Sequence, residues 1–328
     1  MLENLLAGFK PIDLAQMRPV GFTEKEAVNI KSCVDAVDKK NGWVSIEKCP
    51  CCHSFNRKKL FERFSKDILQ CEDCGLGYMA EFPKHLPDVV SDEEYLPSQQ
   101  GSYISNVDYR KKRFGNERLN IIKKFSKRSP GETRLLDVGC GTGWFLEQAL
   151  ESGFNAEGLE LGQDLAEYTS KRLGIKVNCC PLEELSGQCY DVITLFDVIE
   201  HVPNPSQVME SIYSKLNPGG ICLLFTPNLE SLGFHLIKER SSLVMPAEHL
   251  FYFTQKSLAQ IVNRAGLKVL DFSTHGMDIP DLIAHYRDDK GAPEVSAFLE
   301  ENVDILQAVV DKSSMANHMR FVVSRPLS

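Results

Sequence analysis

Short apolar runs alternate with segments of helical periodicity along the carboxyl-terminal two thirds of the chain. The runs that begin at Leu135, end at Glu160, and span 175–178, 190–196 and 221–225 have the length of buried strands. Between them, apolar residues recur every three or four positions, which predicts helices. This alternation predicts an α/β fold built on a parallel sheet.

A glycine-rich turn, Gly139-Cys140-Gly141-Thr142-Gly143, follows the first of these strands. Glycine at every second position lets the backbone turn tightly and approach a ligand closely. The next helix points its amino terminus at the turn, and the second strand ends at Glu160, where a carboxylate can accept hydrogen bonds from ribose hydroxyls. The third glycine comes too early for the dinucleotide fingerprint. The whole tract resembles motif I of the class I S-adenosylmethionine (SAM) methyltransferases.

That resemblance implies a doubly wound, mostly parallel sheet of seven strands that binds SAM as the methyl donor. A second match, 197–202 (Asp-Val-Ile-Glu-His-Val), resembles motif IV of the ubiquinone-type and sugar methyltransferases. The Leu-Asn-Pro-Gly-Gly segment at 216–220 is predicted as a turn before a central strand. The resemblance implies a donor site made of Asp137, Gly139, Cys140, Gly141 and Gly143 at the methionine end, Glu160 at the ribose, Leu161, Cys180 and Leu182 at the adenine, and Phe196 and Asp197 facing the donor.

Tyrosines and basic residues gather just before the sheet. By resemblance, one tyrosine of this region closes over the donor, and we expect Tyr103 to do so, with surface packing as the alternative. Residues 110–128 interleave Lys and Arg with apolar positions, which predicts an amphipathic helix packed on the sheet. Its basic face is either solvated or a positive rim that attracts an anionic small-molecule acceptor.

Two histidines are candidates for the base that removes the acceptor's proton. The segment 247–254 resembles the E-H-L-x-Y-F-[ST] segment of methyltransferases that act on nucleotide-linked sugars, which implies that Glu248 and His249 serve proton abstraction. An imidazole with a pKa of about 6.5 suits that work. His201 is the second candidate. For both histidines, ordering of the local loop is the alternative.

The amino-terminal part carries a pattern of metal ligands. Cys49-x2-Cys52 and Cys71-x2-Cys74 are separated by 18 residues, which is the spacing of a tetrahedral zinc site. Four thiolates close the coordination sphere, so the predicted zinc is structural. A metal-free cysteine cluster is the alternative, and Cys51 or His53 could replace a neighbouring ligand. Alternation at 67–70 and 76–79 predicts short strands beside the second pair.

We therefore predict four regions and one insertion. A helical insertion is expected near the carboxyl terminus, before a final strand at 319–324. The predicted boundaries are 1–45 for an amino-terminal extension, 46–82 for a zinc ribbon, 83–130 for a linker with the lid and basic helix, and 131–328 for the SAM-binding domain with the insertion at 275–318.

Composition narrows the possible partners and location. The net charge of −8 over 328 residues argues against a protein whose main partner is nucleic acid. Within the sequence, no apolar run approaches the roughly 20 residues that span a bilayer. The amino terminus lacks the basic-then-apolar order of a signal peptide. We therefore expect a cytoplasmic protein without a membrane span.

The combined motifs predict an SAM-dependent methyltransferase with a structural zinc. The expected acceptor is a small molecule, namely a nucleotide-linked sugar or another envelope or polysaccharide precursor. Two alternatives stay open: an rRNA or tRNA methyltransferase, because such enzymes also carry zinc modules, and a non-catalytic SAM-binding protein. The atom that receives the methyl group and the oligomeric state are not predicted.

Overall fold

The structure, a computed structural model, describes residues 6, 9–11, 13–40, 42–84, 107–187 and 189–327. The chain divides into two compact units, each assembled from three stretches of sequence. The first, here called the ribbon unit, consists of Met1–Val89, Thr226–Leu258 and Ser273–Arg320. The second, the sheet unit, consists of Val90–Phe225, Ala259–Phe272 and Phe321–Ser328. The boundaries expected from sequence stay predictions.

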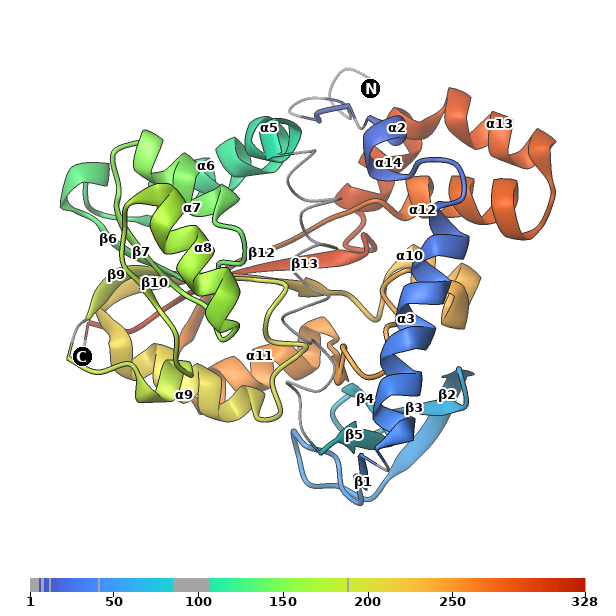
Figure 1. Cartoon of the computed structure of the whole chain (residues 1–328), viewed down its shortest axis with the longest axis horizontal. Helices are drawn as coiled ribbons and strands as arrows, with labels where there is room; N and C mark the ends of the chain where they lie inside the picture. The colour runs from blue at the N-terminus through green and yellow to red at the C-terminus, as the bar shows by residue number, and fades with distance from the viewer. Residues whose placement is uncertain are drawn as a thin grey trace. The chain divides into compact units, whose positions relative to one another are not determined.

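A seven-stranded sheet in the order β12-β13-β10-β9-β6-β7-β8 dominates the sheet unit (Figure 1). The pairs β10/β9, β9/β6, β6/β7 and β7/β8 are parallel, so the predicted doubly wound, mostly parallel α/β sheet is confirmed. The strands are β6 (Arg134–Val138), β7 (Asn155–Leu159), β8 (Val177–Asn178), β9 (Tyr190–Phe196), β10 (Leu216–Pro227), β12 (Lys268–His275) and β13 (His318–Ser324).

Helices cover both faces of this sheet, with α6, α7 and α8 on one face and α9 and α11 on the other (Figure 1). The helical segments are α5 (Val107–Arg110), the π-helix η3 (Lys111–Gly115), α6 (Asn116–Phe125), the 3₁₀-helix η4 (Pro130–Glu132), α7 (Trp144–Glu151), α8 (Gln163–Leu173), the 3₁₀-helix η5 (Leu182–Glu184), α9 (Pro205–Lys215) and α11 (Gln255–Arg264).

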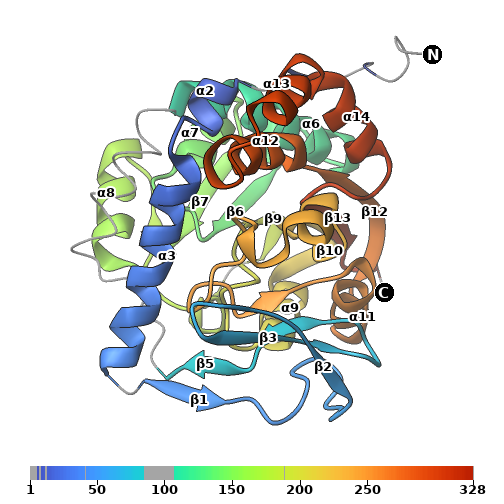
Figure 2. The same ribbon diagram turned by 90° about the vertical axis from the view of Figure 1, so that its right-hand side faces the viewer.

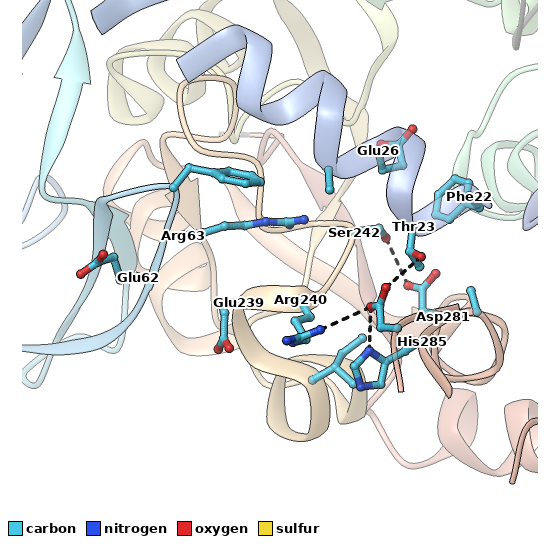
Figure 3. A pocket seen from close by; sticks show the side chains of 15 residues that line it. Phe22, Thr23, Glu26, Glu62, Arg63, Glu239, Arg240, Ser242, Asp281 and His285 are labelled. Carbon is cyan, nitrogen blue, oxygen red and sulfur yellow. Dashed lines mark hydrogen bonds and ion pairs between the residues drawn. The ribbon is translucent and has the colours of Figure 1, made fainter. Parts of the chain in front are cut away.

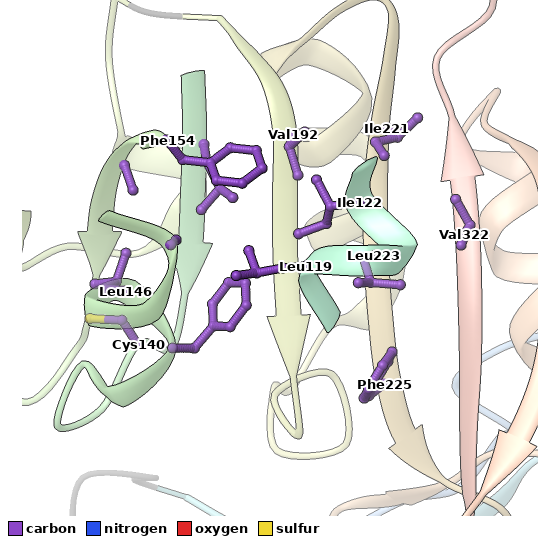
Figure 4. Close-up of a cluster of buried hydrophobic side chains, with 14 residues drawn as sticks. Leu119, Ile122, Cys140, Leu146, Phe154, Val192, Ile221, Leu223, Phe225 and Val322 are labelled. Carbon is purple, nitrogen blue, oxygen red and sulfur yellow. The ribbon is translucent and has the colours of Figure 1, made fainter. Parts of the chain in front are cut away.

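The predicted amphipathic segment at 110–128 packs on the sheet through its apolar side. Leu119 and Ile122 of α6 are buried against Val192 of β9 and Leu223 of β10 (Figure 4). The same cluster includes Phe145 at the start of α7, so the helix that follows the glycine turn shares one core with the strands. Burial of this shared core packs α6 and α7 against the central strands, and the glycine turn joins β6 to α7.

The strand order reverses between β6 and β9. From β6 the chain adds β7 and β8 on one side, and β9 and β10 lie on the other. In open α/β sheets, ligands bind outside the carboxyl ends of the strands at such a switch point. Val138 and Phe196 are the last residues of β6 and β9, so the glycine turn and the segment from Asp197 begin there.

The segment 216–220 differs from the predicted turn. It forms the first part of β10, and the register against β9 shifts between Leu216 and Ile221. Gly219 has φ +76° and donates its N–H to the carbonyl of Arg325. A glycine in this conformation lets a strand bulge without breaking, which is why the Pro-Gly-Gly tract does not end the sheet.

The ribbon unit contains a four-stranded sheet in the order β11-β4-β3-β2 and a two-stranded sheet of β1 and β5 (Figure 2). Two of the four strands lie where short strands were predicted, at β3 and β4. The edge strand β11 comes from far along the chain, and sequence did not predict its place. The strands are β1 (Trp43–Ser45), β2 (Arg57–Arg63), β3 (Lys66–Cys71), β4 (Gly77–Met79), β5 (Glu81–Pro83) and β11 (Phe251–Tyr252).

Helices α12, α13 and α14 form the predicted helical insertion before β13, and α13 and α14 meet at Asn302 (Figure 2). Ile279, Leu282 and Ile283 make its core with Ile237. Among the described residues, no helix is both long and apolar enough to cross a bilayer. The helices of the unit are α2 (Leu14–Met17), α3 (Phe22–Lys39), α10 (Leu232–Ile237), η6 (Lys238–Arg240), α12 (Asp278–Ala284), the π-helix η7 (His285–Asp289), α13 (Pro293–Glu301) and α14 (Val303–Lys312).

Candidate active site

The glycine turn needs glycine for two different reasons. Gly139, Gly141 and Gly143 all have positive φ, at +69°, +52° and +76°. A Cβ on Gly139 would lie 2.5 Å from Cγ2 of Val198, and one on Gly143 would lie 2.5 Å from Cγ2 of Thr169. A Cβ on Gly141 would meet nothing within 4 Å. The turn is therefore closely packed at Gly139 and Gly143, and its backbone is open to a ligand at Gly141.

Glu160 connects the turn to the end of β7. Its carboxylate accepts one hydrogen bond from the N–H of Gly141 and one from the N–H of Gly162, both at 3.0 Å. A carboxylate offers about four lone-pair positions, so these two hydrogen bonds do not use all of its acceptor positions. The side chain is half-buried. This geometry suits the predicted role of Glu160.

Two residues of α8 that sequence reasoning missed hold the turn from the other side. Thr169 donates its hydroxyl to the carbonyl of Gly141 at 2.7 Å, and Arg172 donates Nη2 to the carbonyl of Thr142 at 2.9 Å. The two residues are three positions apart, so they lie on one face of the helix. That spacing was the only sign of these contacts in the sequence. Because the same spacing is common in exposed helices, it did not identify the two residues.

Asp137 of β6 is a buried acid directly below the turn. Its side chain accepts the hydroxyl of Thr194 at 2.6 Å, and the residue is 3% exposed. Burial raises the pKa of Asp137 to about 7, against the opposing effects of the Thr194 hydrogen bond and the positive charge of Arg118. A cation such as the ammonium of an amino acid moiety would favour the ionised form. Asp137 therefore fits the methionine end of the donor.

Phe196 lies in an aromatic cluster that encloses an arginine. The guanidinium of Arg118 lies 3.9 Å from the ring centre of Phe196, 4.7 Å from that of Trp144 and 5.0 Å from that of Phe225. Phe145 meets Phe196 edge to face, with ring centres 4.8 Å apart. Stacking of this kind stabilises both ring and cation. The ring of Phe196 is thereby held in a defined position at the end of β9.

Other basic residues of the segment 110–128 have acidic partners within the sheet unit. Lys111 pairs with Glu151 at 2.7 Å, and Arg128 pairs with Asp191 at 3.3 Å. These pairs favour a structural role for part of the basic face. An anionic acceptor attracted by this helix stays a prediction.

The remaining predicted donor residues of the sheet unit differ in exposure. Leu182 is 4% exposed at the start of η5, Cys180 is half-buried, and Leu161 is 64% exposed. Asp197 is exposed and has φ +57°, a left-handed conformation that is uncommon outside glycine. Tyr103 lies outside the described residues, so its predicted role as a lid stays a prediction.

The four predicted zinc ligands come together in the ribbon unit. The Sγ atoms of Cys49, Cys52, Cys71 and Cys74 all lie within 4.8 Å of one another. The pairs Cys49–Cys74 and Cys52–Cys71 are 3.5 and 3.4 Å apart. Zinc–sulfur bonds of about 2.3 Å in a tetrahedron place sulfurs about 3.8 Å apart, so the cluster is consistent with bound zinc. The hydrogen bond with Cys74 and burial raise the pKa of the Cys49 thiol, so metal binding would release protons.

The two cysteine loops share one backbone geometry, which bears on the alternative ligands. The N–H of His53 donates to the carbonyl of Cys49, and the N–H of Gly75 donates to the carbonyl of Cys71, both at 2.9 Å. His53 and Gly75 both have positive φ. His53 is exposed, and Cys51 is not in the cluster of four. Of the alternatives, the cluster therefore contains Cys49 and Cys52, and it contains neither Cys51 nor His53.

Glu248 and His249 lie in the ribbon unit beside β11. The Sγ of Cys33 on α3 is 3.3 Å from the carboxyl oxygen of Glu248, whose pKa burial raises. His249 is 5% exposed, and its Nδ1 lies 2.8 Å from the carbonyl oxygen of Leu243. The other candidate, His201, is half-buried in the sheet unit, where its backbone N–H donates to the carbonyl of Val198 at 3.0 Å.

A doubly wound sheet with a glycine turn and an acidic strand end at its switch point is the architecture of a Rossmann-like α/β protein. Comparison with known proteins narrows this class. Residues 109–271 match the family described as a methyltransferase domain. Residues 109–271 of this chain therefore contain a methyltransferase domain, as the motifs predicted.

Curated relatives match part of the chain. A ubiquinone biosynthesis O-methyltransferase of Shewanella pealeana is 35% identical over 120 residues, which is 34% of this chain and 50% of the relative. The corresponding protein of Psychrobacter cryohalolentis is 33% identical over 29% of this chain and 41% of the relative. The chain thus spans about half the length, or less, of these relatives.

A solved structure of phosphoethanolamine N-methyltransferase 2 from Haemonchus contortus, in complex with S-adenosyl-L-methionine, is 17% identical. It matches with a TM-score of 0.49 over 82% of this chain and 71% of that one.

Proposed function

We propose that this protein transfers the methyl group of SAM to a hydroxyl oxygen of a small-molecule acceptor. One observation carries the proposal: the open backbone at Gly141, the carboxylate of Glu160 and the buried acid Asp137 lie together at the ends of β6 and β7. The names of the curated relatives, which are O-methyltransferases, support oxygen as the accepting atom.

In this proposal the sheet unit binds the donor. Asp137 pairs with the ammonium group, the backbone of the glycine turn lies against the methionine end, and Glu160 accepts hydrogen bonds from the ribose hydroxyls. Cys180 and Leu182 border the adenine. The donor supplies an electrophilic methyl group, so an oxygen–carbon bond forms as the carbon–sulfur bond breaks and the sulfonium becomes a neutral thioether. The protein's main task is then to position two reactants.

His249 is the proposed acceptor of the hydroxyl proton. A carbonyl oxygen can only accept a hydrogen bond, so the Nδ1 that faces Leu243 carries the hydrogen. The neutral ring then has its lone pair on Nε2, where a general base needs it. General bases of this kind contribute about 10²–10⁴-fold to rate. Glu248 contributes a buried acid to the same segment.

A nucleotide-linked sugar, or another envelope or polysaccharide precursor, is the acceptor class that we favour. Residues 247–254 support it, because they resemble the matching segment of sugar methyltransferases. The cysteine cluster and helices α12 to α14 lie outside the matched residues 109–271, so the acceptor of the relatives does not carry over with the fold. A hydroxylated quinone precursor is the second candidate, because the matched relatives act in ubiquinone biosynthesis.

The test incubates the purified protein with methyl-labelled SAM and, separately, with nucleotide-linked sugars, catechol-type quinone precursors and RNA. We expect label on a nucleotide-linked sugar and a loss of about 100-fold with His249→Asn, at unchanged donor affinity. Label on RNA alone, or donor binding without transfer to any class, would contradict the proposal. The first outcome favours the RNA methyltransferase and the second the non-catalytic SAM-binding protein.

A further inference from the structure

We propose that Arg63, at the end of ribbon strand β2, is a positioning residue for His249. It holds the loop 241–244, whose carbonyl at Leu243 sets the orientation of the imidazole ring. This inference rests on the proposed function of His249. If so, the ribbon unit has a role in the reaction in addition to its predicted zinc site.

Arg63 donates hydrogen bonds to backbone carbonyls on both sides of Leu243, whose own carbonyl oxygen contacts His249. Its Nη1 donates to the carbonyl of Ser241 at 2.8 Å and to that of Val244 at 2.6 Å. Leu243 lies between these two residues in the chain, and its carbonyl oxygen is 2.8 Å from Nδ1 of His249. One guanidinium therefore fixes the backbone on both sides of the group that selects the tautomer of His249.

The space around Arg63 makes its hydrogen bonds to the loop 241–244 sensitive to substitution. Its side chain lines a cavity of about 310 Å³ in the ribbon unit, together with Glu26, Glu239 and Ser242 (Figure 3). A shorter side chain would leave the carbonyls of Ser241 and Val244 facing a space that is large enough for water. The loop would then lose its two charge-assisted hydrogen bonds and gain freedom to move.

Strand β4 holds the chain on the carboxyl-terminal side of His249, through its pairing with β11. β11 pairs with β4, with Phe251 opposite Tyr78, and the N–H of Met79 donates to the carbonyl of Leu250 at 3.0 Å. A Cβ on Gly77 would lie 3.0 Å from Cβ of Tyr252, so glycine permits this close pairing. His249 is thus held through β2 on one side and through β4 on the other.

The test compares Arg63→Met and Arg63→Lys with a matched control, Arg57→Met, in the full-length protein. Arg57 begins the same strand and also donates Nη1 to two carbonyls, those of Ile46 and Glu47, which are remote in sequence from the loop 241–244. The readouts are the ¹⁵N resonances of the His249 ring, which report the tautomer, the turnover number, and the affinity for S-adenosylhomocysteine. Fluorescence of Trp43 reports whether the ribbon is folded.

We expect Arg63→Met to mix the two tautomers of His249 and to lower turnover by about 10- to 100-fold, because a misplacement of about 1 Å can cost 10²-fold. Donor affinity should not change. Arg63→Lys should rescue only part of the loss, because the guanidinium fixes the two N–H groups of Nη1 in its plane, whereas an ammonium rotates freely. Arg57→Met should leave the ring resonances unchanged.

Unchanged ring resonances in both folded Arg63 variants would overturn the inference, as would an equal shift in Arg57→Met. The outcome is separable from that of the proposed function. If His249→Asn kept full activity, His249 would not be the base, yet the ring resonances of the Arg63 variants would still decide whether Arg63 positions it.

Discussion

Three glycine substitutions in the sheet unit distinguish the effects of backbone strain and steric clash on stability from an effect on donor binding. Gly143→Ala combines two costs: φ is +76°, and the new Cβ would lie 2.5 Å from Thr169 and 2.9 Å from Leu173. A left-handed alanine costs about 1–2 kcal/mol, and overpacking a core costs about 1–3 kcal/mol. We therefore expect Gly143→Ala to lower the free energy of unfolding of the sheet unit by about 2–5 kcal/mol.

Two matched variants isolate the components. Gly174→Ala, after α8, has φ +65° and open space around its Cβ, so it should show the strain of about 1–2 kcal/mol alone. Gly141→Ala also has open space, but in the region assigned to the donor. It should lose little more stability than Gly174→Ala and should weaken binding of S-adenosylhomocysteine about tenfold or more, which is about 1.4 kcal/mol.

The chain has two tryptophans, one in each unit, so replacing Trp43 leaves Trp144 as the reporter of the sheet unit. In a Trp43→Phe background, urea unfolding followed by the fluorescence of Trp144, next to Gly143 on α7, reports the sheet unit. Calorimetry measures binding of S-adenosylhomocysteine. Equal stability of Gly143→Ala and Gly174→Ala would refute the predicted clash, and unchanged ligand affinity in Gly141→Ala would refute the assignment of the open side of the turn.

Three further perturbations address the individual groups. Glu160→Gln replaces an acceptor of two backbone N–H groups by an amide with one acceptor oxygen, so the affinity for S-adenosylhomocysteine should fall about 10- to 100-fold. The control is Glu157→Gln on β7, three residues before Glu160, and equal effects of the two substitutions would count against the assignment. Removal of zinc by a chelator should change the fluorescence of Trp43 and spare donor binding, with faster loss at lower pH because protonation competes with the metal; an unaffected Trp43 signal would argue against a structural metal. The folded pKa of Asp137, about 7, is above its unfolded value of 3.8, so its contribution to stability falls as pH rises from about 4 to 7, whereas donor affinity should rise through pH 7 as Asp137 ionises. Thr194→Val removes a hydrogen bond that lowers this pKa, so it should move the midpoint to higher pH, and a midpoint shift to lower pH would contradict the assigned cause.

The contact between the glycine turn and Glu160 was predictable because its parts are close in sequence. A strand, a glycine turn, a helix and a second strand occupy 134–160, and parallel pairing brings the ends of both strands together. Glu160 therefore reaches the N–H of Gly141 with few long-range contacts required. The contact between Asp137 and Thr194, 57 residues apart, depends on the register of β6 against β9, which periodicity alone did not predict.

The cysteine spacing likewise predicted the cluster of four, because each pair sits in a short loop whose geometry is local. It did not predict that β4, which follows the second loop, pairs with β11, or that Arg63 holds the loop before His249. Those contacts join segments more than 170 residues apart, and a two-residue strand has no periodicity to reveal its partner.

The amino-acid sequence by itself determined the glycine turn with its acidic strand end and the cluster of four cysteines, because glycine conformations and cysteine spacing act over a few residues. The tertiary structure decided which groups surround the predicted residues: the hydroxyl of Thr194 on Asp137, the aromatic cluster around Arg118, and the carbonyl of Leu243 beside His249. Such contacts follow from the packing of whole elements against a common core, where burial and shape decide between many pairings that are locally equivalent.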